Sequence, residues 1–298
     1  MASGVEKTEK KRNSNYGSKQ ILKNNHMMIN KIMLKTFMFL FFMNISLNAQ
    51  TQADETQATS AEDLAKQLAN PVASLISIPF QNNFDFNVGP LKGFRYVLNI
   101  QPVIPISLNE NWNMISRTII PIISQSDVTA FDSNDTGLGD IAQSIFFSPK
   151  AVKNGLVWGV GPVLLLPTAT NDVLGVNKWG VGPNGLVLKL QGQWTYGALV
   201  NHIWSYAGSG LNDVDASFFQ PFATYATKTG ASYTVASENT QDWNNNLFGG
   251  FTGIYYAKVT KFGKQMVQLS AGPKVYYGNN PFNPDWGLRA NIILLFPK

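Results

Sequence analysis

The chain has 298 residues, no cysteine and a formal net charge of +5, and its length fits one large all-β domain. Residues 1–35 hold eight of the lysines and arginines against Glu6 and Glu9, so fifteen basic and sixteen acidic groups remain in the rest of the chain. The near-neutral remainder removes the compositional support for nucleic-acid binding. The absence of cysteine excludes disulfides as a source of stability for an exported chain.

The N-terminal region predicts secretion. A basic stretch, 31–35, precedes an apolar run of about a dozen residues, 36–47, which is the pattern of a secretory signal peptide with cleavage expected after Ala49. This run is shorter than the roughly 20 apolar residues that a membrane-spanning helix needs. Residues 1–26 are polar, so we expect residues 1–49 to be an extended N-terminus and signal peptide.

A short helix is predicted directly after a polar linker. Ser60 is placed as its N-cap, Leu64 and Leu68 share one side, and Pro71 ends it at Asn70. A helix of this length is not stable alone in water, so it should rest on the mouth or the interior of the next domain. Residues 50–70 are therefore a predicted periplasmic linker and helix, and residues 71–298 a predicted barrel.

From Pro71 onward, apolar segments of about ten residues alternate with turn signals, which indicates an all-β, closed antiparallel transmembrane β-barrel. Twelve segments are expected, an even number that returns both chain ends to one side of the membrane. They are 72–80, 94–107, 112–123, 138–148, 155–167, 180–190, 193–205, 215–226, 231–238, 247–258, 265–276 and 286–296.

The predicted connections alternate in length, as the short periplasmic turns and longer outer loops of bacterial barrels do. The short set comprises 109–111, 149–154, 191–192, 227–230 and 259–264. The longer set, rich in Asn, Asp and Gly, comprises 81–93, 124–137, 168–179, 206–214, 239–246 and 277–285.

The last segment shows the facing most clearly. Its even positions, from Trp286 to Phe296, are all apolar, whereas the odd positions include Gly287, Arg289 and Asn291. One face is therefore suited to lipid, with an aromatic residue at each membrane interface. A terminal strand ending in an aromatic resembles the signal by which bacterial outer-membrane proteins engage their assembly machinery, which is an expected partner together with the lipid bilayer.

Charged and polar residues in the middle of a strand should face the lumen, because a lipid-facing charge near the midplane costs roughly 2–4 kcal/mol. The basic members are expected to pair with acids such as Asp140 or with the N-terminal segment. The lumen-lining candidates are Arg95, Asn99, Gln101, Arg117, Asp140, Lys189, Lys274, Arg289 and Asn291.

Prolines inside the predicted strands remove ladder donors and should kink the wall. The candidates are Pro102, Pro162, Pro183 and Pro273, three of which follow glycine. Kinked strands leave backbone N–H and C=O groups without a partner, and protein or water must shield these groups from the lipid. We expect 71–83 or the preceding helix to lie in the lumen beside them, with apolar cargo leaving sideways through the bent wall.

Several stretches carry a resemblance to a known family: Asn70 to Asn83, Leu98 to Ser107, Gly137 to Asp140, Trp158 to Thr170, Asn201 to Trp204 and Trp286 to Lys298. They resemble the bacterial outer-membrane transporter-like proteins grouped with the phenol meta-degradation pathway barrels, from about residue 62 to the end. The resemblance implies a channel-like barrel with hydrophobic aromatic compounds as cargo, and no catalytic residues.

Three other motifs favour structural interpretations. Residues 180–185 match a dinucleotide-binding string but have no βαβ unit around them. Residues 132–143 approach a calcium loop but carry Gln143 at the bidentate position, so an outer turn running into the segment 138–148 is preferred, with weak calcium binding as the alternative. His202 is the only histidine after the signal peptide, and no serine can be placed beside it, so a packed or girdle histidine is preferred over a catalytic one.

These observations predict a twelve-stranded barrel in the bacterial outer membrane, with a short N-terminal helix and a narrow or partly plugged lumen. Its expected function is passive diffusion of small hydrophobic or aromatic solutes. The alternative is a structural or adhesive surface protein without transport. No enzymatic activity, cofactor, metal or nucleic-acid partner is expected.

Overall fold

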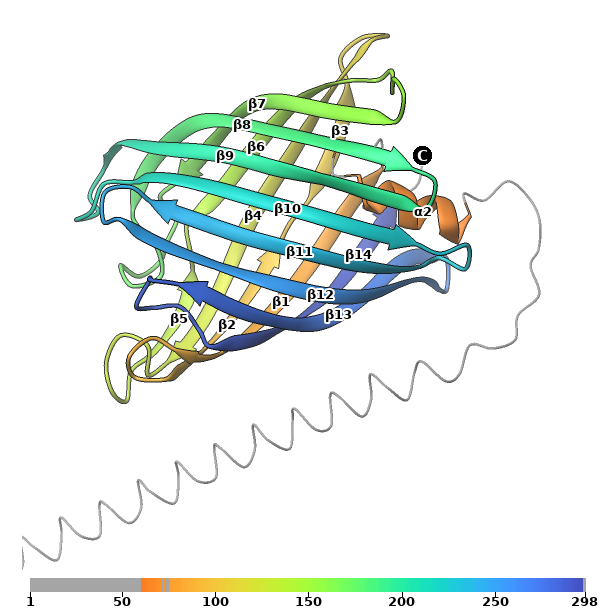
Figure 1. Cartoon of the computed structure of the whole chain (residues 1–298). Helices are drawn as coiled ribbons and strands as arrows, with labels where there is room; N and C mark the ends of the chain where they lie inside the picture. The colour runs from red at the N-terminus through yellow and green to blue at the C-terminus, as the bar shows by residue number, and fades with distance from the viewer. Residues whose placement is uncertain (1–59, 71, 73–74, 297–298) are drawn as a thin grey trace, which may run out of the picture. The chain divides into compact units, whose positions relative to one another are not determined.

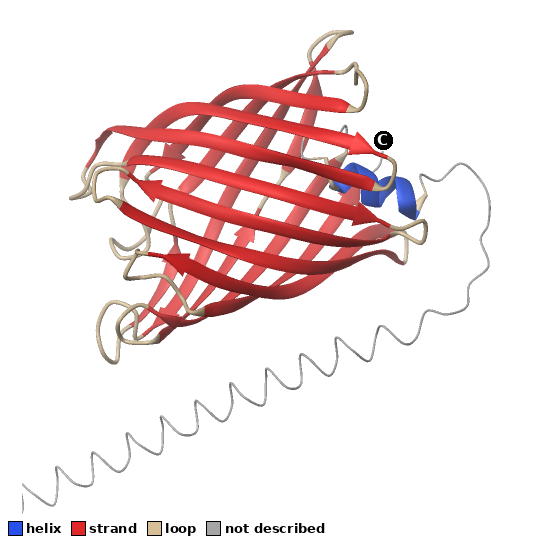
Figure 2. Ribbon diagram, in the orientation of Figure 1, coloured by secondary structure: helices blue, strands red, loops and turns tan. Residues whose placement is uncertain are grey.

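Strands with alternating apolar and polar residues form most of the regular structure in the computed structural model, which describes residues 60–70, 72 and 75–296. One short helix, α2 (Ala61–Leu68), precedes them (Figures 1 and 2). The strands are β1 (Ile76–Val88), β2 (Gly93–Ile100), β3 (Val103–Ser107), β4 (Trp112–Ser126), β5 (Asn134–Leu138), β6 (Ile141–Pro149), β7 (Leu156–Leu166), β8 (Lys178–Gln191), β9 (Trp194–Gly208), β10 (Asp215–Ala226), β11 (Ala231–Asp242), β12 (Leu247–Phe262), β13 (Gln265–Gly278) and β14 (Trp286–Phe296).

The sheet closes because its first and last strands pair. β1 and β14 are antiparallel from Ile76 opposite Phe296 to Phe86 opposite Trp286. β2 and β3 are two parts of one wall strand, both paired with β4, and β5 pairs only with β4. The wall therefore has twelve strands, and the predicted fold class is confirmed.

The first strand was predicted in the wrong place. The pattern predicts a strand over 72–80 and an outer loop over 81–93, whereas β1 runs to Val88 and only 89–92 connect it to β2. Asn83 and Asp85 are buried on the inner face of β1. They alternate along the strand with Phe84 and Phe86, which face outward. The run therefore keeps period two, but its inward positions are polar, which made it look like a loop.

The sorting of connections by length is also weaker than predicted. β11 extends four residues beyond the expected segment 231–238, so 243–246 is a turn of four residues instead of a loop of eight. The shortest connections lie at the opposite end of the barrel, where 192–193 and 263–264 join adjacent strands. Gly192 and Gly263 have φ angles of 61° and 58° there, which glycine adopts without strain. By the rule for bacterial barrels, this is the periplasmic end.

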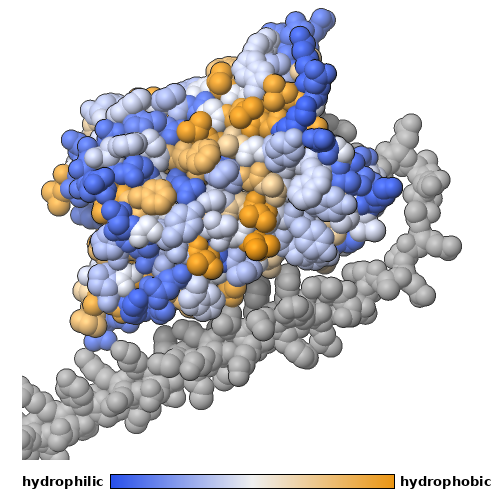
Figure 3. Space-filling view, in the orientation of Figure 1, coloured by the Kyte–Doolittle hydropathy of each residue, from blue (hydrophilic) through white to orange (hydrophobic). Residues whose placement is uncertain are grey.

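The outer surface suits a bilayer. All seven tryptophans are exposed, and they lie toward the ends of strands or in a loop next to a strand. Figure 3 shows apolar residues across the middle of the visible wall and hydrophilic ones mainly toward its ends. Aromatic side chains at both interfaces with an apolar band between them are the pattern of a transmembrane barrel. Among the described residues, no helix has the length and apolarity to cross a membrane.

Two of the proline-containing strands interrupt the ladder of backbone hydrogen bonds at their prolines. Pairing of β6 with β7 skips Gly161 and Pro162, and pairing of β12 with β13 skips Gly272 and Pro273. A Cβ at Gly161 or Gly272 would lie 2.2 or 1.8 Å from a backbone oxygen of the neighbouring strand. The glycine before each proline is thus required by the close approach of the two strands.

The other two proline candidates lie at comparable breaks. Residues 101 and 102 separate β2 from β3, and β8 has no register partner in β9 at Gly182 and Pro183. Pro162 lies directly opposite Pro183 across β7 and β8, which groups two of the breaks in one part of the wall.

α2 packs inside the periplasmic end, near the last described residues of β14 (Figure 1). The Ser60 hydroxyl accepts a hydrogen bond from the Asp63 amide at 3.1 Å, which caps the helix as predicted. Leu64 and Ala65 are fully buried and pack with Val259 and Leu295. The helix is the inward feature of the two that were considered, since most of 71–83 belongs to β1 in the wall.

Candidate functional site in the barrel lumen

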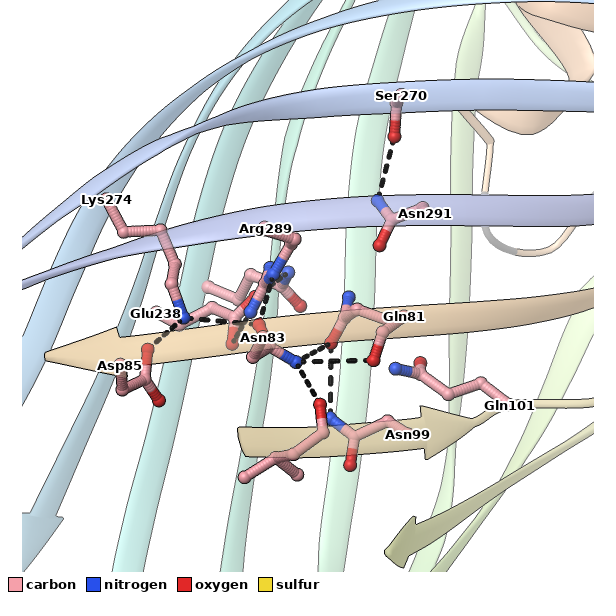
Figure 4. A network of polar contacts seen from close by, with 12 residues as sticks. Gln81, Asn83, Asp85, Asn99, Gln101, Glu238, Ser270, Lys274, Arg289 and Asn291 are labelled. Carbon is pink, nitrogen blue, oxygen red and sulfur yellow. Dashed lines mark hydrogen bonds and ion pairs between the residues drawn. The ribbon is translucent and has the colours of Figure 1, made fainter. Parts of the chain in front are cut away.

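Inward-facing polar residues of β1, β11, β13 and β14 meet in the lumen, in what we call the charged cluster: Asn83, Asp85, Glu238, Lys274 and Arg289 (Figure 4). The strand registers bring them together, because Asn83 lies opposite Arg289 while Asp85 and Lys274 both lie opposite Gly287. The missing side chain at Gly287 leaves the space for this contact: a Cβ there would be 2.6 Å from Asp85 and 3.0 Å from Lys274.

Lys274 is 1% exposed and fully paired. Its Nζ lies 2.8 Å from Asp85 Oδ1 and donates to Asn83 Oδ1 at 3.2 Å and to the Tyr276 hydroxyl at 2.8 Å. The ammonium is also 4.9 Å from the centroid of the Phe251 ring. Three polar partners and an aromatic face compensate a charge that burial would otherwise penalise strongly.

Arg289 connects β14 with β11, which is not its neighbour in the sheet. Its Nη1 donates to Glu238 Oε1 at 2.6 Å, and its Nε donates to Asn83 Oδ1 at 2.7 Å. The guanidinium passes over the Phe251 and Tyr255 rings, 4.9 and 5.6 Å from their centroids. The pair therefore spans β12 and β13 through the lumen and narrows it.

Two further arginines flank the cluster and contact amides instead of acids. Arg117 donates to Gln101 at 2.9 Å, and Arg95 donates to Gln125 at 3.0 Å. Asn99 donates to Gln81 at 3.2 Å on the same inner face. The charged cluster and the two flanking arginines together hold four basic and two acidic side chains, so this part of the lumen carries a surplus of positive charge.

A cavity of about 290 Å³ lies between α2 and the charged cluster. Its polar lining includes Gln101, Arg117, Arg289 and Asn291, and Asn291 donates to Ser270 at 2.9 Å. Leu68 of α2 lines it as well. The helix therefore limits the cavity at the periplasmic end.

The opposite part of the inner wall is apolar. Buried residues from β4 and β6 to β9 form a continuous cluster, with Phe218 and Phe222 of β10 packed against it. Leu199 and Phe222 belong to this surface and also line the cavity. The lumen thus has a polar side and an apolar side, as a path for solutes with an apolar body and one polar group would require.

Two lumen candidates are placed differently from the prediction. Lys189 lies on the outward face, between exposed Leu156 and Tyr196, and its ammonium donates to the Asn154 carbonyl in the periplasmic turn. Its long stem lets the charge reach the membrane interface, so an inward position is unnecessary.

Asp140 does not pair with a lumen cation. Its carboxylate accepts backbone N–H bonds from Thr168, Ala169, Val176 and Asn177, at 2.6 to 3.1 Å. It therefore fixes the outer loop that follows β7. The nearby stretch weighed as a calcium loop contains strand β5, which pairs with β4.

The outer rim has a second carboxylate contact of this kind. Asp285 accepts from Asn87 at 2.9 Å and pairs with Lys92 at 3.1 Å. The hydrogen bonds from Asn87 and Lys92 hold the pKa of Asp285 below its ordinary value. The contacts tie the turn between β1 and β2 to the loop before β14.

His202 has the serine neighbour that the sequence did not reveal. Its Nδ1 lies 2.8 Å from the Ser217 hydroxyl, and its Nε2 lies 3.0 Å from Asp215. Trp243 donates from its indole N–H to the same hydroxyl at 2.9 Å. The group faces outward, because Ser217 and His202 lie opposite each other and each lies two residues along its strand from an exposed side chain, Phe219 or Val200.

The class of protein follows from three features: the wall closes with twelve antiparallel strands, its exterior is apolar with aromatic residues toward the strand ends, and its lumen is polar. The chain is an outer-membrane β-barrel. It has the fold of an outer membrane channel from Pseudomonas putida F1, with a TM-score of 0.61, 14% identity, and coverage of 75% of this chain and 96% of that one. A comparison of the sequence with protein-family models and with curated proteins finds no match.

Two more distant structures also align. The TodX monoaromatic hydrocarbon channel gives a TM-score of 0.38, 11% identity, and coverage of 74% of this chain and 88% of that one. Outer membrane phospholipase A from Escherichia coli gives a TM-score of 0.41, 10% identity, and coverage of 74% of this chain and 96% of that one.

The expectation that the chain has no enzymatic activity is corrected here. Its premise fails, because Ser217 lies beside His202, with its hydroxyl 2.8 Å from Nδ1.

Proposed function

We propose that the protein is a channel that passes small hydrophobic or aromatic solutes across the outer membrane by passive diffusion. The observation that carries the proposal is the cavity of about 290 Å³ within the closed wall, bounded by α2 and the charged cluster and lined by both polar and apolar side chains. This volume lies near the small end of the ~300–1,000 Å³ typical of ligand pockets, so it suits a solute with one ring. The solved structures of similar fold include channels.

The lumen-lining residues have separate roles in this proposal. Asn99, Gln101, Arg117, Lys274, Arg289 and Asn291 supply hydrogen bonds and charge, and the ion pairs of Lys274 and Arg289 restrict the path of large polar solutes. Phe222 and Leu199 supply apolar contact. A solute with an apolar ring replaces part of its hydration by contact with this wall, whereas a sugar does not.

The adhesive alternative is not favoured, because two of the outer connections, 89–92 and 243–246, are only four residues long. Liposome swelling separates the two functions. The full chain is reconstituted and exposed to matched gradients of benzyl alcohol, phenol, arabinose and a trisaccharide. The proposal expects protein-dependent swelling with the aromatic solutes and little with the trisaccharide. Rates equal to those of protein-free liposomes for every solute contradict it.

A further inference from the structure

Arg117 differs from the two basic residues of the charged cluster. Among the described residues, Lys274 and Arg289 form ion pairs with Asp85 and Glu238, whereas Arg117 has only a hydrogen bond to the neutral side chain of Gln101. Arg117 also lines the cavity. A guanidinium presents five N–H donors in a planar fork, so a single contact with an amide leaves most of its donors available to a ligand.

The surroundings of Arg117 reinforce its preference for an anion. Four basic and two acidic side chains lie in and around the charged cluster, so introduction of one negative charge reduces the local imbalance instead of creating one. Arg289, which lines the same cavity, is already neutralised by Glu238 at 2.6 Å. Glu238 attracts Arg117 as well, but its ion pair is with Arg289, so Arg117 is the cavity arginine that has no ion pair among the described residues, and it fits a ligand with a single negative charge.

A second polar group in the cavity lacks a partner. The Tyr255 side chain is 7% exposed and lines the cavity, and its hydroxyl has no hydrogen-bond partner among the described residues. A buried hydroxyl without a partner is costly, and a ligand oxygen in the cavity would accept its hydrogen bond. Leu199 and Phe222 provide an apolar surface in the same cavity.

We propose that this cavity is a binding site for small aromatic carboxylates, with the carboxylate on Arg117 and the ring against the apolar lining. The inference rests on the proposed channel function and names its substrate class. Carboxylate is preferred among anions because its two oxygens match the guanidinium fork and because a cavity of about 290 Å³ leaves room for one ring beside it. The channel would thereby concentrate the anionic form of an aromatic solute over the neutral form.

Titration calorimetry on the full chain in detergent tests the inference, with benzoate and its neutral isostere benzamide as probes. The unmodified protein should bind benzoate at least about tenfold more tightly than benzamide, since hydrogen bonds to charged groups are the strong ones. Arg117→Gln should abolish this preference and leave benzamide binding unchanged. Arg117→Lys, which keeps the charge but not the fork, should retain part of it.

The matched control is Arg95→Gln. It removes the same charge from the neighbouring wall strand, but Arg95 does not line the cavity, so the benzoate preference should persist. Equal losses in Arg95→Gln and Arg117→Gln would show that only the general positive charge of the lumen matters, and would overturn the inference. No preference for benzoate in the unmodified protein would overturn it as well.

Folding and the channel function are controlled separately. Each variant is checked for heat-modifiable mobility on a gel, and a variant that does not fold is replaced by Gln101→Leu, which removes the amide that holds Arg117 at 2.9 Å and should lower benzoate affinity severalfold. Swelling with benzyl alcohol reports the channel function alone. Passage of benzyl alcohol without benzoate preference refutes only the binding inference, whereas absence of passage refutes the proposed function.

Discussion

The packing of α2 determines how freely polar solutes should cross this barrel. Leu64 is fully buried and belongs to one buried cluster with Leu295 and Val259 at the periplasmic end of the lumen. An eight-residue helix has no independent stability, so this packing holds it in place. Truncation of a buried leucine to alanine costs about 2–5 kcal/mol, which lowers the ratio of docked to undocked helix about thirtyfold even at the lower limit.

Leu64→Ala should therefore raise conductance in planar bilayers and the rate of arabinose swelling, while heat-modifiable mobility stays unchanged because α2 is not part of the wall. Lys66→Ala is the matched control. Lys66 pairs with Glu62 on the surface of the helix, with side-chain exposures of 37% and 27%, and such a pair contributes about 0–1 kcal/mol, so its flux should equal that of the unmodified protein. Deletion of residues 60–70 removes the helix and gives the highest polar flux that its undocking can produce. If neither Leu64→Ala nor the deletion raises polar flux, α2 does not restrict the lumen.

Three other changes test separate parts of the structure. Asp140→Ala should cost about 1–3 kcal/mol through its lost backbone hydrogen bonds and open the outer loop 167–177 to limited proteolysis; a cleavage pattern identical to that of the unmodified protein would refute this role. Glu238→Gln leaves the guanidinium of Arg289 without its acid, so it should destabilise the barrel by up to about 3–5 kcal/mol, as thermal unfolding in detergent would report, and shift the reversal potential in a KCl gradient toward anions. Replacing Pro162 and Pro273 by valine should slow aromatic uptake without unfolding the barrel if cargo leaves through the kinked wall, and an unchanged uptake rate would exclude that route.

Period-two alternation predicted the wall strands well where their inward faces carry both apolar and polar residues. β10 and β14 begin and end at the predicted residues, and the polar odd positions of β14 face the lumen. The same rule failed for 81–88, where the inward positions are amide and carboxylate side chains that also occur in loops. A period-two search that allows a polar inward face would have found Phe84 and Phe86 on one side and Asp85 on the other.

The partners of the charged residues could not be predicted from the sequence, because they depend on strand register and on distances across the lumen. The strand that contains Glu238 was predicted, but its pairing with Arg289 follows from how the wall curves over β12 and β13. His202 and Ser217 are directly opposite residues of β9 and β10, and a shift of one residue in either strand would place them on different faces. The carboxylate of Asp140 was assigned to the lumen by its charge alone, whereas four backbone donors of one loop fix its position.

The central claim is that an aromatic solute crosses the membrane through this barrel, and stopped-flow uptake into proteoliposomes tests it most directly. Vesicles that contain increasing amounts of the folded full chain are mixed with benzoate, and the change in light scattering that accompanies entry of the solute is followed. The uptake rate is compared with that of vesicles carrying the heat-unfolded protein. The account predicts a rate that rises in proportion to the folded protein per vesicle and exceeds the rate for a trisaccharide measured by swelling at the same protein density. A rate independent of the amount of folded protein, equal to that of the heat-unfolded control, would contradict it.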